Sequence, residues 1–260
     1  MHSLATPTVV FDLDGTLVHT VPDIAAALDC ALADYGCGPT SPAEAATMMG
    51  DGLSEFFWRA LVAKRLALPA IEADATRKRF IAAYRKTPAH LSEVYPGIRE
   101  LLLELRERSV LTAVCTNKVE TIALDILRAL ALTDLFDAVV GSGGDKPMKP
   151  HPAPVQQAVA RAGGHMERSL LVGDTGADNG AAIAAGIPLV LLTYGYSHFP
   201  IGSLRYGTAV DDAAHLREHI LAFVSEDTSL PKATPPFVEI AARDEPDMLR
   251  DYAAPYRLAA

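Results

Sequence analysis

The chain has 260 residues, half of them hydrophobic, and a formal net charge of −9 at neutral pH. This length suffices for one large core, or for a core domain together with a smaller one. The acidic balance disfavours a binding surface for nucleic acid or for an anionic membrane. The first residues lack the charged and apolar regions of a signal peptide, and the three cysteines form no CxxC pair. We therefore expect a cytoplasmic protein without disulfides, either a monomer or a homodimer.

The apolar pattern predicts a sheet domain that a helical segment interrupts. A short apolar run at residues 8–11 indicates a strand buried on both faces, and residues 21–90 then contain only helical patterns and turn signals. Further apolar runs follow at residues 110–115, 138–140, 169–172 and 188–192. Segments with helical spacing lie beside these runs, at residues 98–108, 119–132, 153–162 and 177–185. Strands that alternate with helices are typical of an α/β fold with a doubly wound parallel sheet.

These patterns divide the chain into three parts. We predict a core domain from residues 1–18 and 92–224, an inserted all-helical domain from residues 19–91, and a tail from residues 225–260. The tail holds five prolines and shows weak periodicity, so we expect it to be extended or to drape over the core.

One uncharged segment could be mistaken for a membrane span. Residues 179–204 contain no Asp, Glu, Lys or Arg, which is long enough to cross a bilayer. However, Gly186, Pro188, Gly195 and Pro200 interrupt it. We expect a helix end, a turn and a strand instead.

Polar side chains follow the predicted strands. Ligands of open α/β sheets bind beyond the carboxyl ends of the strands, so these side chains are expected to converge at one edge. They are Asp12 and Asp14, Thr116 and Asn117, Asp174 and Asp178, and, in the loop after residue 140, Lys146 and Lys149.

The carboxylates of this edge need a cation. Two carboxylates about 4 Å apart repel by roughly 4 kcal/mol at an effective dielectric constant of about 20, so Asp12 and Asp174 need a cation or a shared proton. Mg²⁺ prefers oxygen ligands and usually binds one or two carboxylates together with a substrate phosphate. That phosphate would draw on Lys149, on the Thr116 hydroxyl and on backbone N–H groups of the Gly15 turn. The edge is therefore predicted to bind magnesium and a phosphoryl group.

Four short motifs carry a family resemblance. The stretches "DLDGT", "CTNK", "KPHP" and "GDTGAD", in this order, resemble the four motifs of the haloacid dehalogenase-like hydrolases. The helical insertion after the first motif resembles the subgroup with a small helical cap on a Rossmann-like core. Within this subgroup, "VFDLDGTLVHTVPDIAAAL", "YPGIRELLLELRER", "KPHPAP" and "TYGY" most resemble phosphoglycolate phosphatases. The resemblance implies a phosphatase that acts on a small phosphorylated metabolite similar to 2-phosphoglycolate.

The resemblance also implies roles for single residues. Asp12 would be the nucleophile that becomes a phosphoaspartate, and Asp14 the general acid and base. Asp12, Asp174 and the backbone carbonyl of Asp14 would bind magnesium, and Asp178 would orient metal-bound water. The residues implied in holding the phosphate and substrate are Gly15, Thr16, Gly52, Thr116, Asn117 and Lys149.

The chain departs from the family pattern at a few positions. His19 stands where relatives usually carry an acidic residue, and Thr175 where they usually carry a serine. Asp51 and Gly52 lie where the cap loop is thought to reach the active site. An aspartate there would repel a carboxylated substrate unless a basic residue such as Arg59 or Lys64 offsets it.

Other interpretations stay open at this stage. A sugar-phosphate mutase of the same fold would also keep both aspartates, a dehalogenase would leave Asp14 without a role, and a non-catalytic member would bind a partner. Asp174 and Asp178 could simply cap a helix, while Thr116 and Asn117 could close a strand. The side chains that we expect to serve packing are Phe56, Phe57, Trp58 and Cys115.

Overall fold

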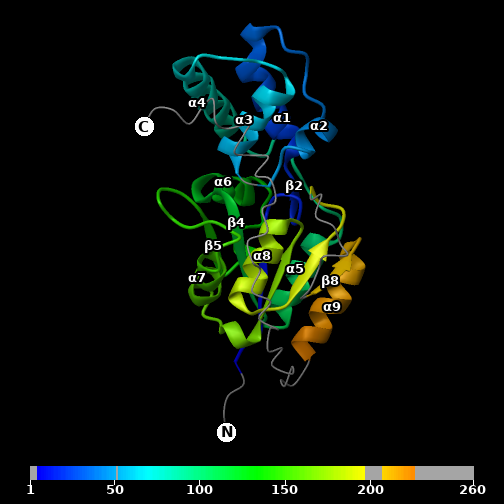
Figure 1. Ribbon diagram of the computed structural model, residues 1–260. Helices are drawn as coiled ribbons and strands as arrows, with labels where there is room; N and C mark the ends of the chain where they lie inside the picture. The colour runs from blue at the N-terminus through cyan, green and yellow to red at the C-terminus, as the bar shows by residue number, and fades with distance from the viewer. Residues whose placement is uncertain (1–4, 51, 197–206, 226–260) are drawn as a thin grey trace.

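A computed structural model describes residues 5–50, 52–196 and 207–225 of the chain. Figure 1 shows an α/β domain with a second, all-helical part above one end of its sheet. This arrangement confirms the predicted fold class. Asp51 and residues 226–260 lie outside the described residues, and with them the expected course of the tail.

The α/β domain is built on a six-stranded sheet with the order β5-β4-β1-β6-β7-β8, in which all neighbouring strands are parallel. The strands are β1 (Thr8–Phe11), β4 (Leu111–Val119), β5 (Ala138–Ser142), β6 (Ser169–Gly173), β7 (Leu189–Leu192) and β8 (Gly207–Val210). Thr8 of β1 pairs with Leu111 on one side and with Ser169 on the other. The first strand therefore lies between the two strands that also end in predicted site residues.

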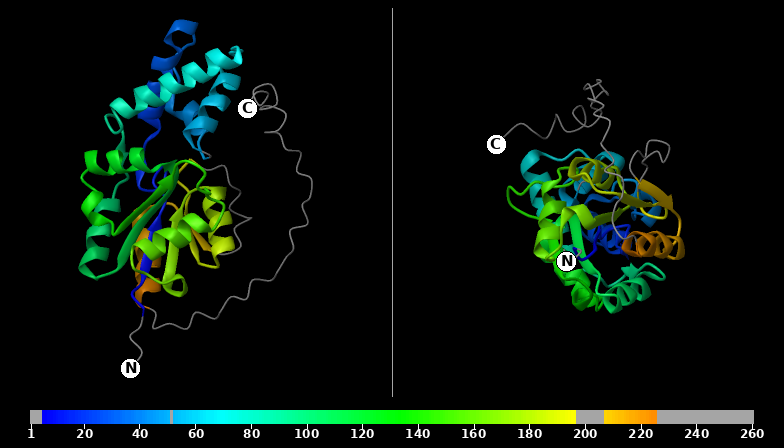
Figure 2. Two further views of the ribbon diagram at one scale, coloured as in Figure 1. Left: turned by 90° about the vertical axis from the view of Figure 1, so that its left-hand side faces the viewer. Right: turned by 90° about the horizontal axis from the view of Figure 1, so that it is seen from below.

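Helices cover both faces of the sheet, as the left view of Figure 2 shows. They are α5 (Ile98–Glu107), α6 (Glu120–Ala129), α7 (Ala153–Arg161), α8 (Gly176–Ala185) and α9 (Ala213–Ser225). Successive residues of β1 point to opposite faces: Val9 packs into the cluster with α5, α6 and α9, and Val10 into the cluster with α7 and α8. Burial on both faces explains why the strands appear in the sequence as continuous apolar runs.

The inserted part contains α1 (Val21–Leu32), α2 (Pro42–Ala46), α3 (Leu53–Ala63) and α4 (Ala70–Lys86), with a short 3-10 turn at Ala33–Tyr35. We call this part the cap. Ser41 caps α2 by accepting a hydrogen bond from the backbone N–H of Glu44. The rings of Phe56 and Phe57 lie 5.7 and 6.0 Å from that of Phe80, so they serve packing as expected.

The chain enters and leaves the cap through a two-stranded ribbon. Strand β2 (Val18–His19) pairs antiparallel with β3 (Glu93–Val94). Beside the ribbon, the buried carboxylate of Asp23 accepts hydrogen bonds from the backbone N–H groups of Leu91, at 3.0 Å, and Ser92, at 2.8 Å. The Ser92 hydroxyl donates to the same carboxylate at 2.5 Å. This carboxylate fastens the start of the cap to its end.

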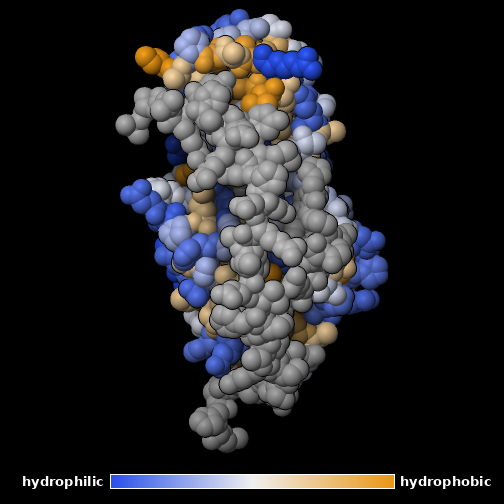
Figure 3. All heavy atoms as spheres, in the orientation of Figure 1, coloured by the Kyte–Doolittle hydropathy of each residue, from blue (hydrophilic) through white to orange (hydrophobic). Residues whose placement is uncertain are grey.

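The segment that could be mistaken for a membrane span contains the end of α8 and strand β7, in agreement with the sequence analysis. Within the described ranges, no helix has both the length and the apolar character needed to cross a bilayer. In Figure 3, the visible coloured surface of the α/β domain is mainly hydrophilic, and hydrophobic residues gather on the cap.

The replacement of Asp23 by alanine is expected to lower the free energy of unfolding by about 3 kcal/mol, because it leaves the N–H groups of Leu91 and of the buried Ser92 without their acceptor. Urea denaturation would measure the change. The control is Asp34→Ala, which removes an exposed ion pair with Arg79 and should change the same quantity by less than about 0.5 kcal/mol. Equal losses in the two variants would contradict the anchoring role of Asp23.

Candidate active site

The carboxyl ends of three adjacent strands, β4, β1 and β6, bring the predicted side chains together beneath the cap. Asp12 and Asp14 follow β1, Thr116 and Asn117 lie near the end of β4, and Asp174 follows β6. A cleft of about 460 Å³, including its opening to solvent, lies between this edge and the cap. Its lining residues are Asp12, Asp14, Met49, Gly50, Gly52, Leu53, Phe56, Thr116, Asn117, Lys118, Thr175 and Tyr196.

Lys149 holds two of the carboxylates. Its Nζ lies 3.0 Å from Asp12 Oδ1 and 2.6 Å from Asp178 Oδ1, and it donates to the backbone carbonyl of Cys115 at 2.7 Å. Burial alone would lower the pKa of this ammonium, but the two aspartates raise it above its ordinary value. Lys149 therefore stays charged beside Asp12.

Asn117 fixes the loop that carries Lys149. Its side-chain amide donates to the backbone carbonyl of Lys149 and accepts from the backbone N–H of the same residue, both at 2.9 Å. Both polar ends of the Asn117 amide are thus occupied by protein. Although Asn117 lines the cleft, it acts on the loop more directly than on a substrate.

The carboxylates of Asp12, Asp174 and Asp178 form a buried acidic group, since one oxygen of each lies within 4.8 Å of the others. Burial raises the pKa of Asp12 to about 6 and that of Asp174 well above the ordinary value. Asp12 Oδ1 has no hydrogen-bond partner among the described residues, even though Lys149 Nζ is close to it. The raised pKa values show that positive charge is short around these carboxylates, and Asp12 Oδ1 lacks a hydrogen-bond donor in the described part of the chain. Such a group of hard oxygen ligands fits a divalent cation such as Mg²⁺.

Thr16 and two glycines position Asp174. The Thr16 hydroxyl donates to Asp174 Oδ1 at 2.9 Å, and the backbone N–H of Tyr196 donates to Oδ2 at 2.7 Å. A Cβ atom on Gly15 or Gly195 would overlap the Asp174 carboxylate, and Gly15 has a left-handed φ of 83°. The substrate contacts of Thr16 and Gly15 stay predictions. In the structure the Thr16 hydroxyl binds Asp174, and the Gly15 N–H donates to the Val18 carbonyl at 3.0 Å.

Asp178 acts within the protein. Its Oδ2 accepts from the hydroxyl of Thr175 at 2.6 Å and from the backbone N–H of the same residue at 3.0 Å, which forms a capping box at the start of α8. Because Lys149 binds the other oxygen, both oxygens of Asp178 have protein donors. Its helix-capping role was foreseen, and its action on metal-bound water stays a prediction.

Lys118 is the residue of this edge to which the sequence analysis assigned no role. Its Nζ lies 2.7 and 2.8 Å from the two carboxylate oxygens of Asp14. The Thr20 hydroxyl donates to the same carboxylate, and the ring centre of Tyr84 lies 5.0 Å from the ammonium. A signal was available in "CTNK": Thr116 and Lys118 are two residues apart, which in a regular strand places them on one face, and both line the cleft.

Three further positions from the sequence analysis lie away from the cleft. Arg59 donates to the carbonyls of Met48 and Met49, at 3.3 and 3.4 Å, and so holds the loop between α2 and α3. Lys64 binds the Gly38 carbonyl and forms an ion pair with Glu44. His19 Nδ1 lies 2.9 Å from the Tyr196 hydroxyl, in the ribbon. None of these three is among the cleft-lining residues.

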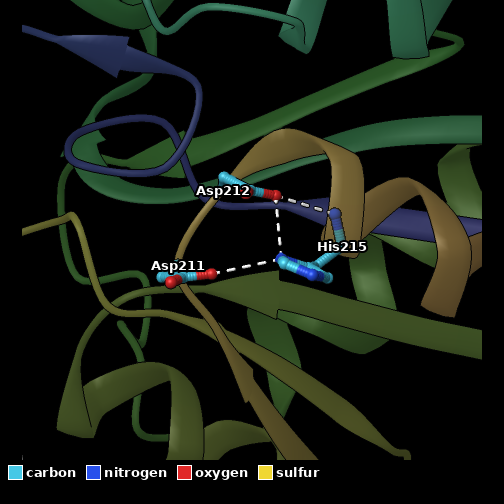
Figure 4. A group of neighbouring side chains, drawn as sticks. All are labelled: Asp211, Asp212 and His215. Carbon is cyan, nitrogen blue, oxygen red and sulfur yellow. Dashed lines mark hydrogen bonds and ion pairs between the residues drawn. The ribbon is translucent and has the colours of Figure 1, made fainter.

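A second group of possible metal ligands lies at the start of α9, where Figure 4 shows Asp211, Asp212 and His215. All three are exposed. Asp212 Oδ1 accepts from the backbone N–H of His215 at 2.8 Å, and His215 Nδ1 lies 3.2 Å from Asp211 Oδ1. These bonds are those of a helix N-terminus and do not indicate a metal site.

Known proteins are similar to this chain in sequence. A family model described as haloacid dehalogenase-like hydrolase matches residues 9–192. A phosphoglycolate phosphatase of Cereibacter sphaeroides is 40% identical over 200 residues, which are 77% of this chain and 91% of that protein. A phosphoglycolate phosphatase of Rhodospirillum rubrum is 39% identical over 213 residues, or 80% of this chain and 88% of that protein.

Solved structures agree. A crystal structure from Haemophilus somnus, described as a predicted phosphoglycolate phosphatase, superposes with a TM-score of 0.73 at 30% identity. It covers 82% of this chain and 98% of its own. Sequence and fold thus point to the same group of enzymes.

Magnesium is expected to raise the melting temperature more at about pH 7.5 than at about pH 5. Because the pKa of Asp12 is raised to about 6, this group contributes stability below about pH 4 that is lost as the pH rises through about 6. Above that pH the carboxylate is charged, and magnesium bound to it should stabilise the folded protein, which raises the melting temperature by about 2–4 °C for each kcal/mol. Thermal unfolding with and without magnesium at both pH values measures the effect.

Two matched variants locate this effect. Asp174→Asn should abolish the magnesium-dependent increment, whereas Asp211→Asn, from the exposed group, should keep it. A full increment in Asp174→Asn would show that magnesium stabilises the protein elsewhere.

Proposed function

The chain belongs to the haloacid dehalogenase-like hydrolases and is a phosphatase, and on this premise we propose that it hydrolyses 2-phosphoglycolate, with magnesium, through a phosphoaspartate on Asp12. The observation that carries the proposal is the ion pair of Asp12, which lines the cleft, with the buried Lys149 at 3.0 Å. The names of the relatives support the choice of substrate.

In the first step, an Asp12 oxygen attacks phosphorus while the ester P–O bond breaks. The leaving alkoxide takes a proton from Asp14, whose carboxyl group lines the same cleft. Lys149 offsets the charge of Asp12 and of the phosphoryl oxygens. Thr116 Oγ1 accepts from the backbone N–H of Lys118 at 3.2 Å, which leaves its hydroxyl hydrogen for a phosphoryl oxygen.

In the second step, Asp14 takes a proton from water as the water oxygen attacks phosphorus, and Asp12 leaves as a carboxylate. Magnesium would be held by the carboxylates of Asp12 and Asp174 and the backbone carbonyl of Asp14, and when bound it supplies positive charge toward the phosphoryl oxygens. Met49, Leu53 and Phe56 of the cap line the opposite side of the cleft and exclude water from the reacting atoms.

The place of action belongs to the proposal as well. Cys30, Cys37 and Cys115 are all free, which suits a reducing compartment. We place the enzyme in the cytoplasm, acting on a soluble phosphate ester.

Release of inorganic phosphate from 2-phosphoglycolate should require magnesium and should fall by at least about 1000-fold in Asp12→Asn, because the amide cannot form the phosphoaspartate. Sugar phosphates, nucleotides and pyridoxal phosphate should be poorer substrates. An isomerised sugar phosphate without phosphate release would favour the mutase. Undiminished turnover by Asp12→Asn would contradict the mechanism.

Asp14→Asn should separate substrates by their leaving groups. Without a proton donor, an alkyl phosphate such as 2-phosphoglycolate should lose about 100-fold to 10,000-fold in kcat, because its alkoxide leaves poorly. An aryl phosphate such as p-nitrophenyl phosphate should lose much less in the step that forms the phosphoaspartate. Pre-steady-state release of p-nitrophenol measures that step alone, and equal losses for both esters would argue against Asp14 as the acid.

A further inference from the structure

Lys118 is a buried cation for which the mechanism above has no use. Its side chain is only 1% exposed, yet it lines the cleft beside Asp14, whose side chain is 15% exposed. We propose that Lys118 binds the carboxylate of the leaving group and so selects 2-phosphoglycolate among small phosphate esters, an inference that rests on the proposed function.

The charges around the cleft support this assignment. Among the cleft-lining residues that the structure describes, Lys118 is the one cation. The other lysine of the site, Lys149, is engaged by Asp12, Asp178 and the Cys115 carbonyl. On the cap side, the described lining residues are uncharged: Met49, Gly50, Gly52, Leu53 and Phe56. An anionic group on the leaving side of the substrate therefore meets positive charge at Lys118.

The donors of Lys118 leave room for a substrate. A lysine ammonium has three N–H groups, and among the described residues the hydrogen-bond acceptors of this one are the two oxygens of Asp14. Within the described ranges, no third acceptor binds Nζ, and the Tyr84 ring beside it offers a π face only. One N–H is thus available to a carboxylate that enters the cleft.

The chemistry of the substrate places its carboxylate there. Asp14 has to reach the ester oxygen, and in 2-phosphoglycolate a single methylene separates that oxygen from the carboxylate carbon. Lys118 Nζ lies within hydrogen-bond distance of both Asp14 oxygens. A substrate positioned for proton transfer from Asp14 therefore brings its carboxylate close to Lys118, where a charge-assisted hydrogen bond forms.

The earlier candidates for this role, Arg59 and Lys64, are not among the described residues that line the cleft. Arg59 binds the carbonyls of Met48 and Met49, and Lys64 binds Glu44 and the Gly38 carbonyl. Among the described residues, the cation that lines the cleft is therefore Lys118, on the core side.

The test compares two esters of similar size, 2-phosphoglycolate and the uncharged-tail analogue 2-hydroxyethyl phosphate. In Lys118→Gln, kcat/KM for 2-phosphoglycolate should fall by about 100-fold. For 2-hydroxyethyl phosphate the fall should be at least about ten times smaller, because that ester makes no charged contact with Lys118. Lys118→Arg, which keeps the charge, should retain part of the preference.

The control variant is Lys146→Gln, which removes the same charge from a half-exposed loop lysine near Glu120. It should leave the ratio between the two esters unchanged. Should Lys118→Gln fail to fold, Lys118→Met offers a side chain of similar length that packs well against Tyr84. Calorimetric binding of both esters to Asp12→Asn and to Asp12→Asn with Lys118→Gln gives the same comparison without turnover.

The outcomes distinguish the two proposals. A wild-type preference for 2-phosphoglycolate that Lys118→Gln abolishes supports the inference. The same preference kept in Lys118→Gln, or equal losses on both esters, overturns the inference and leaves the proposed function standing. A wild-type enzyme that hydrolyses 2-hydroxyethyl phosphate as well as 2-phosphoglycolate overturns the proposed substrate, and the inference with it.

Discussion

One buried ammonium makes the rest of the site possible. Lys149 lies 3.0 Å from Asp12 and 2.6 Å from Asp178, in a group where a third carboxylate, that of Asp174, is also close. Removing one partner from such a buried pair commonly costs about 3–5 kcal/mol, because the other charge remains unpaired. The elements around Lys149 support this contact. Asn117 fixes its loop, β4 supplies the Cys115 carbonyl, and the first turn of α8 holds Asp178 in a capping box.

A second ion pair gives the two aspartates that follow β1 different surroundings. Asp12 is buried against Lys149, whereas Asp14 faces Lys118 and the Thr20 hydroxyl. Two carboxylates separated by a single residue in sequence thus have different partners and different access to solvent. Different surroundings are what allow two neighbouring carboxylates to take different roles in one site.

The sequence predicted the sheet and the edge, because the signals for both are local. Continuous apolar runs indicate strands buried on both faces, and parallel strands end at one edge, so Asp12, Thr116 and Asp174 had to meet. Short elements with little burial gave weak patterns: β8, whose first residue is exposed, and the two-residue strands of the ribbon.

Partners across elements were harder to foresee. That Thr16 binds Asp174, that Asn117 binds the loop of Lys149 and that Lys118 binds Asp14 depends on distances between segments far apart in the chain. A period-two count along β4 places Thr116 and Lys118 on one face, but it does not give Lys118 a partner. The order and spacing of motifs in the sequence therefore identified most residues of the site, and the folded structure showed which of them contact one another.

The division between core and cap explains how such a site can keep its chemistry while its substrate changes. Thr116 and Lys149, which we propose to bind the phosphate, belong to the sheet domain, and the uncharged lining residues Met49, Leu53 and Phe56 belong to the cap. Lys118 lies where the two parts meet, because its ammonium binds Asp14 of the core and lies beside the ring of Tyr84 from α4. A change of cap residues near Tyr84 would therefore alter the surroundings of the leaving group without moving Lys149, since the contacts of Lys149 come from the core alone.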